Sequence, residues 1–321
     1  MGNQNPVVCL GIMVADVLGK PLKSIPEPGR LVLVEEMSLH TGGCAVNTAT
    51  ALASLGVPVE IVGKVGSDPF GEFLLSELIN RGIGVEGVTK DKTTGTSATM
   101  VMVDPDGERR FVHYIGANAK LTIEDVDTDL FIGKSILHIA GSLVLPGIDG
   151  ESTAKLLRSA RAKGLITFLD TVWDDTGRWI QLMKPCLPYI DFFVPSLPEA
   201  QEITHLDDPI DVARSLIKDG VGTVGLKMGP EGCLVMNQDG EIIRYPAFPV
   251  RVVDATGAGD AYAAGFITGI WNGWKLEKTA LFANAVGAMC VTGLGASGGV
   301  STMKDTQEFI EKTPINQIHG A

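Results

Sequence analysis

The chain has 321 residues, 45% of them hydrophobic and 20% charged, and its formal net charge is −12 at pH 7. This composition is typical of a globular chain with a large core, and the acidic balance argues against nucleic acid as a partner, because phosphate binding requires a basic surface. Since no apolar run is long enough to span a bilayer, we expect no membrane partner either. No Ser/Pro-rich linker, charge block or low-complexity tract divides the chain, so we predict a single domain over residues 1–321.

Five cysteines are scattered along the chain, with neither a CxxC pair nor the spacing of a metal site: Cys9, Cys44, Cys186, Cys233 and Cys290. Isolated cysteines of this kind are typical of reduced thiols in the cytosol. The first residues, MGNQNPVVCLGIMVAD, lack the basic region and the cleavage site of a signal peptide. We therefore expect a cytoplasmic protein.

Apolar, strand-like runs alternate with helical patterns from the N-terminus onward. The expected strands are 7–14, 59–65, 136–141, 165–170, 191–195 and 223–228. The expected helices are 47–56, 70–82, 151–164 and 208–220, several of which end in glycine, the usual C-terminal stop. Near-continuous apolar strands separated by helices predict an α/β fold with a mostly parallel sheet covered on both faces. Ligands of such sheets bind at the carboxyl ends of the strands.

Two polar, alternating segments, 31–40 and 97–114, interrupt this pattern and predict a small β-sheet lid that stands off the main sheet. The inserted lid segments are about 15–42 and 95–116. Because an isolated flap is marginal in water and its exposed edges invite pairing, we expect a homodimer formed through the lid. A later hairpin, 233–236 with 241–245, is expected at the edge of the main sheet.

The most informative stretch is Asp254-Ala-Thr-Gly-Ala-Gly-Asp260, which follows an extended, β-branched approach and precedes a helical apolar run. Gly257, Ala258 and Gly259 form a small-residue turn whose unpaired N–H groups are suited to bind an anion. The carboxylate of Asp260 cannot itself bind phosphate, because like charges repel, but it can take a proton from a hydroxyl that attacks the phosphate. The alternative is that Asp260 only caps the helix.

A second glycine-rich motif is HTGGCAVNTATALASLG, residues 40–56. Gly42 and Gly43 let a ligand approach the backbone, and Asn47, in the first turn of the expected helix, offers both a donor and an acceptor. With no Lys or Arg nearby, these groups suit a neutral polyhydroxyl better than a phosphate. The alternative is a simple turn before a helix.

Together the two motifs resemble the signatures of the ribokinase-like, or phosphofructokinase B, family of sugar kinases. The resemblance covers nearly the whole chain and includes further blocks in the same order: VGKVGSDPFG at 62–71, GERRFVHYIGANAKL at 107–121, SLPE at 196–199, LKMGPEG at 226–232 and FANAVGAMCVTGLGAS at 282–297. It implies a three-layer ribokinase-like sandwich with a β-sheet lid and ATP-dependent phosphorylation of a hydroxyl on a sugar or sugar-like substrate.

The resemblance also implies roles for individual residues. Asp260 corresponds to the catalytic base, and Gly257, Ala258 and Gly259 to the anion hole that stabilises the transferring γ-phosphoryl group. The sugar-binding positions are Asp16, Gly42, Gly43 and Asn47. The nucleotide-binding positions are Lys227, Gly229, Gly232 and Asn284.

Two acidic residues correspond to cation sites of the family. Glu199 is the acid of the family's NxxE motif, which organises Mg²⁺ mainly through water, as Mg²⁺ usually binds. Asp254 is compatible with a monovalent cation such as K⁺, together with the backbone near Thr256 and residues 293–295.

The sequence departs from the family pattern at two of these places. Ser196 replaces the Asn of NxxE, which puts the water network around Mg²⁺ in doubt, and Cys44 replaces the Lys of ribokinase-type sequences, which weakens a pentose-specific interpretation. Trp173, Asp174 and Arg178 follow an expected strand end and are candidates for substrate selection, with core packing as the alternative.

Two other functions remain open. One is a nucleoside kinase on the same fold, which the absence of an aromatic cluster near residues 42–47 makes the second choice. The other is a non-catalytic binding or regulatory protein that responds to a sugar or nucleotide. Because a pure binder has no need of a base, Asp260 after an intact Gly-Ala-Gly favours the enzyme.

Overall fold

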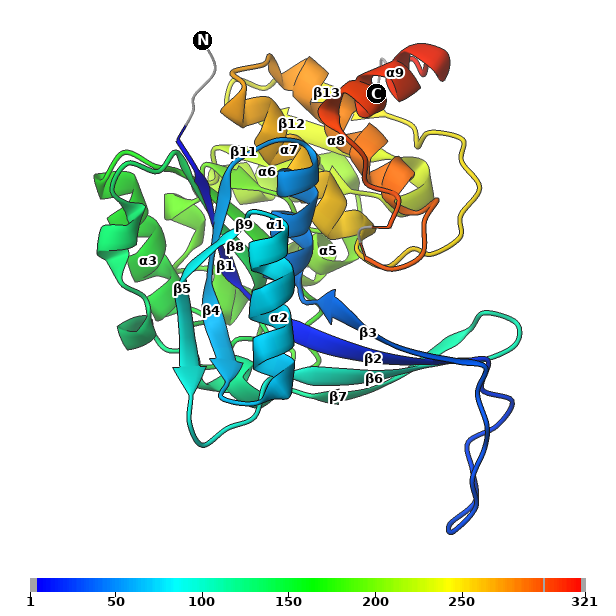
Figure 1. The fold of residues 1–321 in the computed structure, drawn as a ribbon. Helices are drawn as coiled ribbons and strands as arrows, with labels where there is room; N and C mark the ends of the chain where they lie inside the picture. The colour runs from blue at the N-terminus through cyan, green and yellow to red at the C-terminus, as the bar shows by residue number, and fades with distance from the viewer. Residues whose placement is uncertain (1–4, 297, 319–321) are drawn as a thin grey trace.

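The computed structural model of the protein describes residues 5–296 and 298–318. In this part of the chain the larger sheet has nine strands in the order β13-β12-β11-β10-β9-β8-β1-β4-β5 (Figure 1). Neighbouring strands from β11 to β5 are parallel, whereas β12 is antiparallel to β11 and to β13. The strands are β1 Val7–Gly11, β4 Val59–Gly66, β5 Gly84–Asp91, β8 Ile136–Ser142, β9 Ile166–Thr171, β10 Phe192–Phe193, β11 Thr223–Lys227, β12 Cys233–Asn237 and β13 Ile242–Tyr245.

Helices cover both faces of this sheet, which therefore has two separate cores. Along β1, Val7 and Cys9 face one core, while Val8 and Leu10 face the other. The first core packs against α1 (Cys44–Ser54), α2 (Pro69–Asn80), α7 (Ala258–Trp271), α8 (Leu276–Cys290) and α9 (Met303–Lys312). The second packs against α3 (Glu151–Ala162), α4 (Trp179–Met183), α5 (Leu197–Thr204) and α6 (Pro209–Lys218). Burial on both faces explains why these strands have near-continuous apolar sequences.

Short 3₁₀ turns complete the connections: η1 Gly116–Lys120, η2 Ile123–Asp125, η3 Thr128–Phe131, η4 Leu187–Tyr189 and η5 Gly229–Glu231. Among the described residues, no helix combines the length and the hydropathy that a membrane crossing requires.

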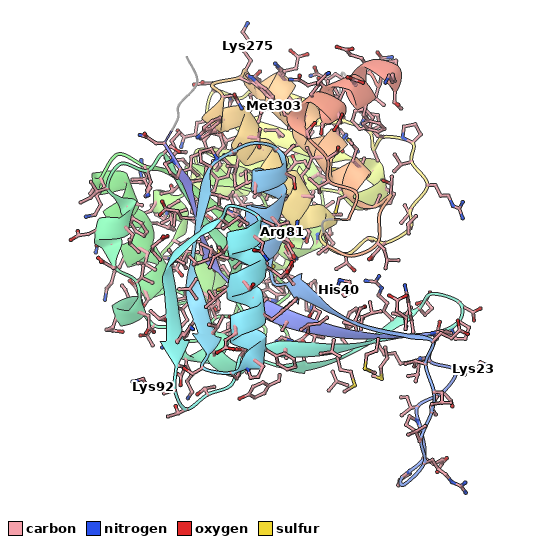
Figure 2. All side chains as sticks on the ribbon, viewed as in Figure 1. Lys23, His40, Arg81, Lys92, Lys275 and Met303 are labelled. Carbon is pink, nitrogen blue, oxygen red and sulfur yellow. The ribbon has the colours of Figure 1, made fainter. Side chains whose placement is uncertain are left out.

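A second, four-stranded sheet projects from the side of the main body (Figure 1). Its order is β3-β2-β6-β7, with strands β2 Val14–Lys20, β3 Glu36–Gly42, β6 Ala98–Val103 and β7 Arg109–Tyr114. Between β2 and β3 a long loop, which carries Lys23, extends further from the body (Figure 2). The two predicted lid segments thus form one sheet.

The prediction of this second sheet was wrong in two details. Residues 31–35 lie outside any strand, so the predicted strand 31–40 is observed only from Glu36 onward. The predicted first strand, 7–14, ends at Gly11, and Val14 already belongs to β2 of the second sheet. At the bend between them, the Asn118 side chain bonds both backbone groups of Met13, at 3.1 and 3.0 Å, and so takes them out of either sheet.

In the main sheet the other predicted strands, the edge hairpin and the predicted helices are confirmed, with shifts of a few residues at their ends. The strand predicted at 191–195 has only two residues in strand geometry, and it stops before Pro195, which has no N–H for the ladder. The edge strand β5 was not predicted, because its sequence GVEGVTKD mixes glycine and charge and has no apolar run.

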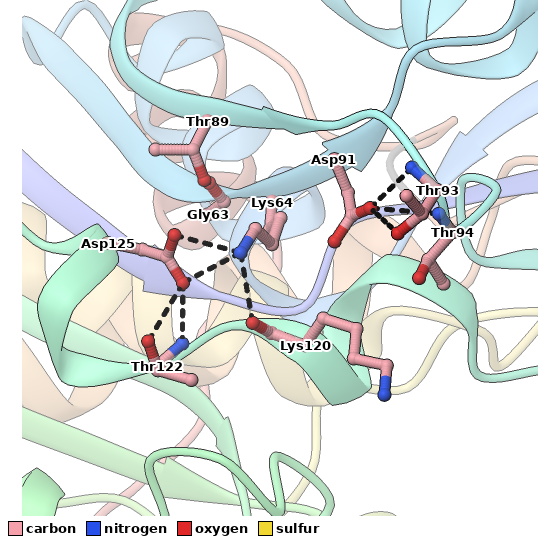
Figure 3. Close-up of polar contacts among 9 residues, drawn as sticks. All are labelled: Gly63, Lys64, Thr89, Asp91, Thr93, Thr94, Lys120, Thr122 and Asp125. Atoms are coloured by element: carbon pink, nitrogen blue, oxygen red, sulfur yellow. Dashed lines mark hydrogen bonds and ion pairs between the residues drawn. The ribbon is translucent and has the colours of Figure 1, made fainter.

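Both ends of the second inserted segment are held by polar contacts at the rim of the main sheet (Figure 3). Before the segment, the Asp91 carboxylate accepts hydrogen bonds from the backbone N–H groups of Thr93 and Thr94, both at 2.8 Å. After it, Lys64 of β4 donates to the Asp125 carboxylate at 2.8 Å and to the Lys120 carbonyl at 3.0 Å. The segment that contains β6 and β7 is therefore anchored to the main sheet on both sides.

Helices α7 and α8 pack very closely in the first core, and α7 begins at the DATGAGD motif. A Cβ atom placed on Gly265 of α7 would lie 2.8 Å from the Cα of Ala283 in α8. By contrast, a Cβ atom on Gly287 of α8 would meet no atom closer than 3.4 Å, the carbonyl oxygen of Ala258. Only the first glycine is required by the helix contact.

We expect Gly265→Ala to lower the free energy of unfolding by about 1–3 kcal/mol, because the added methyl group overpacks the contact between α7 and α8. Gly287→Ala is the matched control and should leave stability unchanged or raise it by up to about 1 kcal/mol through helix propensity. Urea denaturation of both variants measures the difference. Equal stabilities would show that the two helices separate easily in solution.

Candidate active site

Helix α7 begins at a turn that only glycine accommodates well. Gly257, the N-cap residue, has φ +75°, and a Cβ atom there would lie 2.1 Å from the carbonyl oxygen of Ala296. Among the described residues, no side chain caps this helix start. The alternative in which Asp260 is only a cap is therefore not supported. The Ala258 N–H makes a long contact of 3.3 Å with the Ala255 carbonyl, and the helix start remains suited to an anion.

The Asp260 carboxylate points instead toward α1. Its Oδ2 atom accepts a hydrogen bond of 2.8 Å from Nδ2 of Asn47, and the Asp260 residue is 9% exposed. Burial raises the pKa of Asp260 above its usual range, while the hydrogen bond from Asn47 and the charge of Lys227 oppose the increase. A carboxylate with a raised pKa and a fixed orientation is a stronger proton acceptor than an ordinary aspartate.

The two partners of this hydrogen bond line two different cavities. The larger, about 590 Å³, is lined by Asp260, Gly257 and Gly259 together with Lys227 and Gly229. The smaller, about 200 Å³, lies between the second sheet and the main body and is lined by other residues of the predicted site and of the second sheet: Asp16, His40, Gly43, Asn47, Thr99, Arg109 and Phe111. Asp260 lines the larger cavity and its partner Asn47 lines the smaller one.

The predicted sugar-binding residues lie together around the smaller cavity. Asp16 of β2 stands beside Gly42 of β3, where a Cβ atom would be 2.1 Å from the Asp16 Oδ2 atom, so a larger residue at 42 would displace this carboxylate. Burial raises the pKa of Asp16. This increase is opposed by a hydrogen bond from the Thr99 hydroxyl and by the nearby His113 and His40. The result is a polar wall rich in hydrogen-bonding groups.

Asp170, which the sequence interpretation did not single out, is a central residue of the larger cavity. Both of its carboxylate oxygens lie 2.7 Å from Nζ of Lys227, and both side chains are largely buried. Burial alone would lower the pKa of Lys227, but the carboxylates of Asp170 and Glu199 raise it above the ordinary lysine value. Lys227 therefore stays charged beside the first turn of α7. The sequence feature that could have identified Asp170 is its position as an acidic residue near the carboxyl end of a buried strand, β9.

Glu199 and Ser196 form a capping box at the start of α5. The Glu199 Oε2 atom accepts from the Ser196 N–H at 3.0 Å and from the Thr171 hydroxyl at 3.0 Å, and the Ser196 hydroxyl accepts from the Glu199 N–H. Ser196 thus holds the Glu199 carboxylate in place.

The larger cavity fits Mg²⁺ held mainly by water and phosphate. Its wall carries the carboxylates of Glu199, Glu231, Asp170 and Asp260, of which Asp170 is paired with Lys227 and Asp260 accepts from Asn47. Within residues 5–296 and 298–318, no three His, Cys, Asp or Glu side chains gather as a protein cage for a metal ion. One or two carboxylates are what Mg²⁺ usually takes from a protein.

Other predicted residues lie outside both cavities. The Asn284 side chain donates to the Pro246 carbonyl at 2.7 Å, and the Gly232 carbonyl accepts from the Met228 N–H at 2.9 Å, which closes the η5 turn. The Asp174 carboxylate accepts from the backbone N–H groups of Thr176 and Arg178 and so shapes the loop after β9. The structure shows local backbone roles for these three residues.

Asp254 is already neutralised by a residue of the second sheet. Its Oδ2 atom lies 2.5 Å from Nη2 of Arg109 and accepts from the Gly295 N–H at 2.7 Å, and its Oδ1 atom accepts from the Thr256 N–H at 3.0 Å. Burial would raise the pKa of Asp254, but these hydrogen bonds hold it below its usual range. The carboxylate expected to bind a monovalent cation is thus surrounded by N–H donors.

Comparison with known proteins agrees with this arrangement. A family model described as pfkB family carbohydrate kinase matches residues 4–303. An uncharacterized sugar kinase of Archaeoglobus fulgidus is 30% identical over 79% of this chain and 99% of its own length. The probable fructokinase-5 of Arabidopsis thaliana is 27% identical over 97% of this chain and 99% of its own length. A solved E. coli structure, provisionally named ribokinase II and in complex with ATP and Mg²⁺, has a TM-score of 0.85 at 23% identity, over 96% of this chain and 99% of that one.

The predicted ribokinase-like fold, a mostly parallel α/β sheet with a small second sheet, is therefore confirmed. The chain belongs to the pfkB family of carbohydrate kinases. The predicted enzyme class, an ATP-dependent carbohydrate kinase, is confirmed with it.

We expect Asp170→Leu to lower the free energy of unfolding by about 3–5 kcal/mol, because the buried ammonium of Lys227 loses its main partner. Replacing both residues, Asp170→Leu with Lys227→Met, should recover most of this loss. Lys304→Met is the control, since Lys304 pairs with Glu308 at 3.9 Å on the surface and should change stability by less than about 1 kcal/mol. Guanidinium denaturation measures the free energy of unfolding of each variant. If Asp170→Leu is as stable as this control, the pairing of Asp170 with Lys227 does not stabilise the protein.

Proposed function

We propose that the protein transfers the γ-phosphoryl group of ATP to a hydroxyl of a neutral sugar, with Asp260 as the base. The observation that carries this proposal is the hydrogen bond between Asp260 and Asn47 at the boundary of the two cavities. A base at such a boundary can reach a hydroxyl in one cavity while phosphate lies in the other, which is the geometry that phosphoryl transfer requires.

The residues then have the following roles. The sugar lies in the smaller cavity, with Asp16 and Asn47 bonding its hydroxyl groups, Gly43 lining the same wall and Gly42 leaving room for the Asp16 carboxylate. ATP lies in the larger cavity, where Lys227 and Gly229 face its phosphates. Mg²⁺, organised by Glu199 through water, neutralises phosphate charge when bound.

In the chemical step Asp260 accepts the proton of the sugar hydroxyl, and the hydroxyl oxygen forms a bond to the γ-phosphorus. The bond from the γ-phosphorus to the β–γ bridging oxygen breaks, and ADP leaves. N–H groups of residues 257–259 hold the transferring group as an anion hole. The raised pKa of Asp260 favours its role as acceptor.

Neutral sugars are preferred over other substrates because of the charges around the smaller cavity. Its cationic lining residue, Arg109, is bound to Asp254, and the remaining polar groups are suited to hydroxyls. A nucleoside kinase remains the second candidate, because Phe111 lines the same cavity and offers a ring on which a base can stack.

We further propose a homodimer through the second sheet. The face turned away from the cavity carries a cross-strand row of apolar side chains, Val17, Met100 and Val112, in line with Leu39, which packs against the first core. Met100 and Val112 are 55% and 59% exposed, and the edge strands β3 and β7 are open to pairing. The single-domain organisation, the cytoplasmic location and the absence of nucleic-acid and membrane partners stay predictions.

We expect a panel of sugars and nucleosides to identify a sugar that elicits ADP release from ATP, and Asp260→Asn to lower kcat for it by about 10²–10⁴-fold, because the proton acceptor is lost. Sugar affinity measured by calorimetry should change little and serves as the control for folding. If only nucleosides in the panel are phosphorylated, the protein is a nucleoside kinase and the sugar-kinase proposal is wrong. A loss of kcat below about tenfold would mean that Asp260 is not the base.

We expect kcat to fall on acidification at a pH above the usual aspartate range, because Asp260 must be ionised and its pKa is raised. Asn47→Leu should move this acid limb to still higher pH, since the lost hydrogen bond favours the ionised form, and should raise the KM for sugar more than that for ATP. Thr99→Val removes a hydroxyl from the same cavity without touching Asp260, so its acid limb should stay in place. An unmoved limb in Asn47→Leu would show that Asp260 does not control the rate.

A further inference from the structure

Arg109 joins three separate segments of the chain at one point. It is the first residue of β7 in the second sheet, and its register partner is Val103 of β6. Its Nη1 atom donates to the Thr256 hydroxyl at 2.6 Å and its Nη2 atom to the Asp254 carboxylate at 2.5 Å. Asp254 in turn accepts from the N–H of Gly295. The guanidinium therefore connects the second sheet with residues 254–256, just before the anion hole, and with the loop after α8.

The oxygens near Asp254 do not fit a monovalent metal ion in this arrangement. Such an ion binds oxygen atoms, but both Asp254 oxygens already face N–H donors. Two backbone carbonyls of the same region, those of Thr256 and Ala296, face the thiol of Cys290 at 3.7 and 3.3 Å. A metal ion would have to displace the guanidinium or compete with these donors.

We propose that the Arg109 guanidinium is a built-in cation of this kinase, which makes turnover independent of monovalent metal ions. The Asp254 side chain is 2% exposed and lies six residues before the base, close to the turn that holds the anion. An unneutralised carboxylate there would repel the transferring phosphoryl group. Arg109 cancels this charge and fixes the hydroxyl of Thr256, the residue next to Gly257.

The contact also makes Arg109 a positioning residue for the second sheet. Arg109 lines the smaller cavity together with Asp16 and Thr99 of the same sheet. Its guanidinium links the sheet that walls this cavity to the segment before the anion hole, so the charge of Asp254 is cancelled while the sheet holds this position. The inference rests on the proposed phosphoryl transfer.

The experiment compares kcat in K⁺ and in tetramethylammonium salts at constant ionic strength. The native protein should have the same kcat in both. Arg109→Met should lose about tenfold or more in tetramethylammonium, because charge-assisted hydrogen bonds are lost, and K⁺ should restore part of this loss at the vacated site. Arg109→Lys keeps the charge and should depend less on K⁺ than Arg109→Met does.

Arg110→Met is the matched control. Arg110 points to the other face of the second sheet, its side chain is 52% exposed, and it pairs with Asp104 at 3.6 Å. This variant should have the kcat of the native protein in both salts.

Thermal melting provides a readout that does not depend on turnover. K⁺ should raise the Tm of Arg109→Met and leave the Tm of the native protein and of Arg110→Met unchanged. If no compound in the panel is phosphorylated, the proposed function fails while this measurement still decides the role of Arg109. Two results would overturn the inference. One is a native protein whose kcat depends on K⁺ as strongly as that of Arg109→Met. The other is an Arg109→Met variant that has the native kcat in both salts and whose Tm does not change with K⁺.

Discussion

The hydrogen bond between Asn47 and Asp260 brings the first turns of α1 and α7 together, although 213 residues separate the two side chains in the chain. Each helix starts at a glycine with positive φ, Gly43 and Gly257, so each presents its N-terminal turn at the same end of the sheet. The bond fixes the orientation of the Asp260 carboxylate, and its two partners line different cavities. The proposed division of the site into a sugar side and a phosphate side depends on this contact.

Acidic side chains next to the proposed phosphate site are matched individually by donors or cations. Asp170 is paired with Lys227, Asp254 with Arg109, and Asp260 accepts from Asn47. Buried carboxylates without such partners would be costly to ionise and would repel phosphate. Since these partners come from β11, β7 and α1, the electrostatics of the site are a property of the assembled fold and of the position of the second sheet.

Much of this architecture was predictable from local patterns. Apolar runs and glycine stops predicted the buried strands and several helices, because burial on both faces of a parallel sheet leaves a simple signal. The two glycine-rich motifs predicted two helix starts, and Asp16, Gly42, Gly43 and Asn47 do lie together. The edge strand β5 and the four-strand pairing of the second sheet escaped prediction, since glycine-rich, charged or half-exposed strands have no distinctive pattern.

Residue types and their order along the chain are sufficient to indicate the fold class and the family, and they predict Asp260 as the base. They do not indicate that Asp170 pairs with Lys227, that Asn284 bonds to a backbone carbonyl instead of lining a cavity, or that Arg109 meets Asp254. Local patterns reflect the hydrogen bonding and burial of neighbouring residues, whereas each of these contacts joins residues at least 38 positions apart in the chain. Such pairs form only when strands and helices pack, so the tertiary structure alone determines which charges are neutralised.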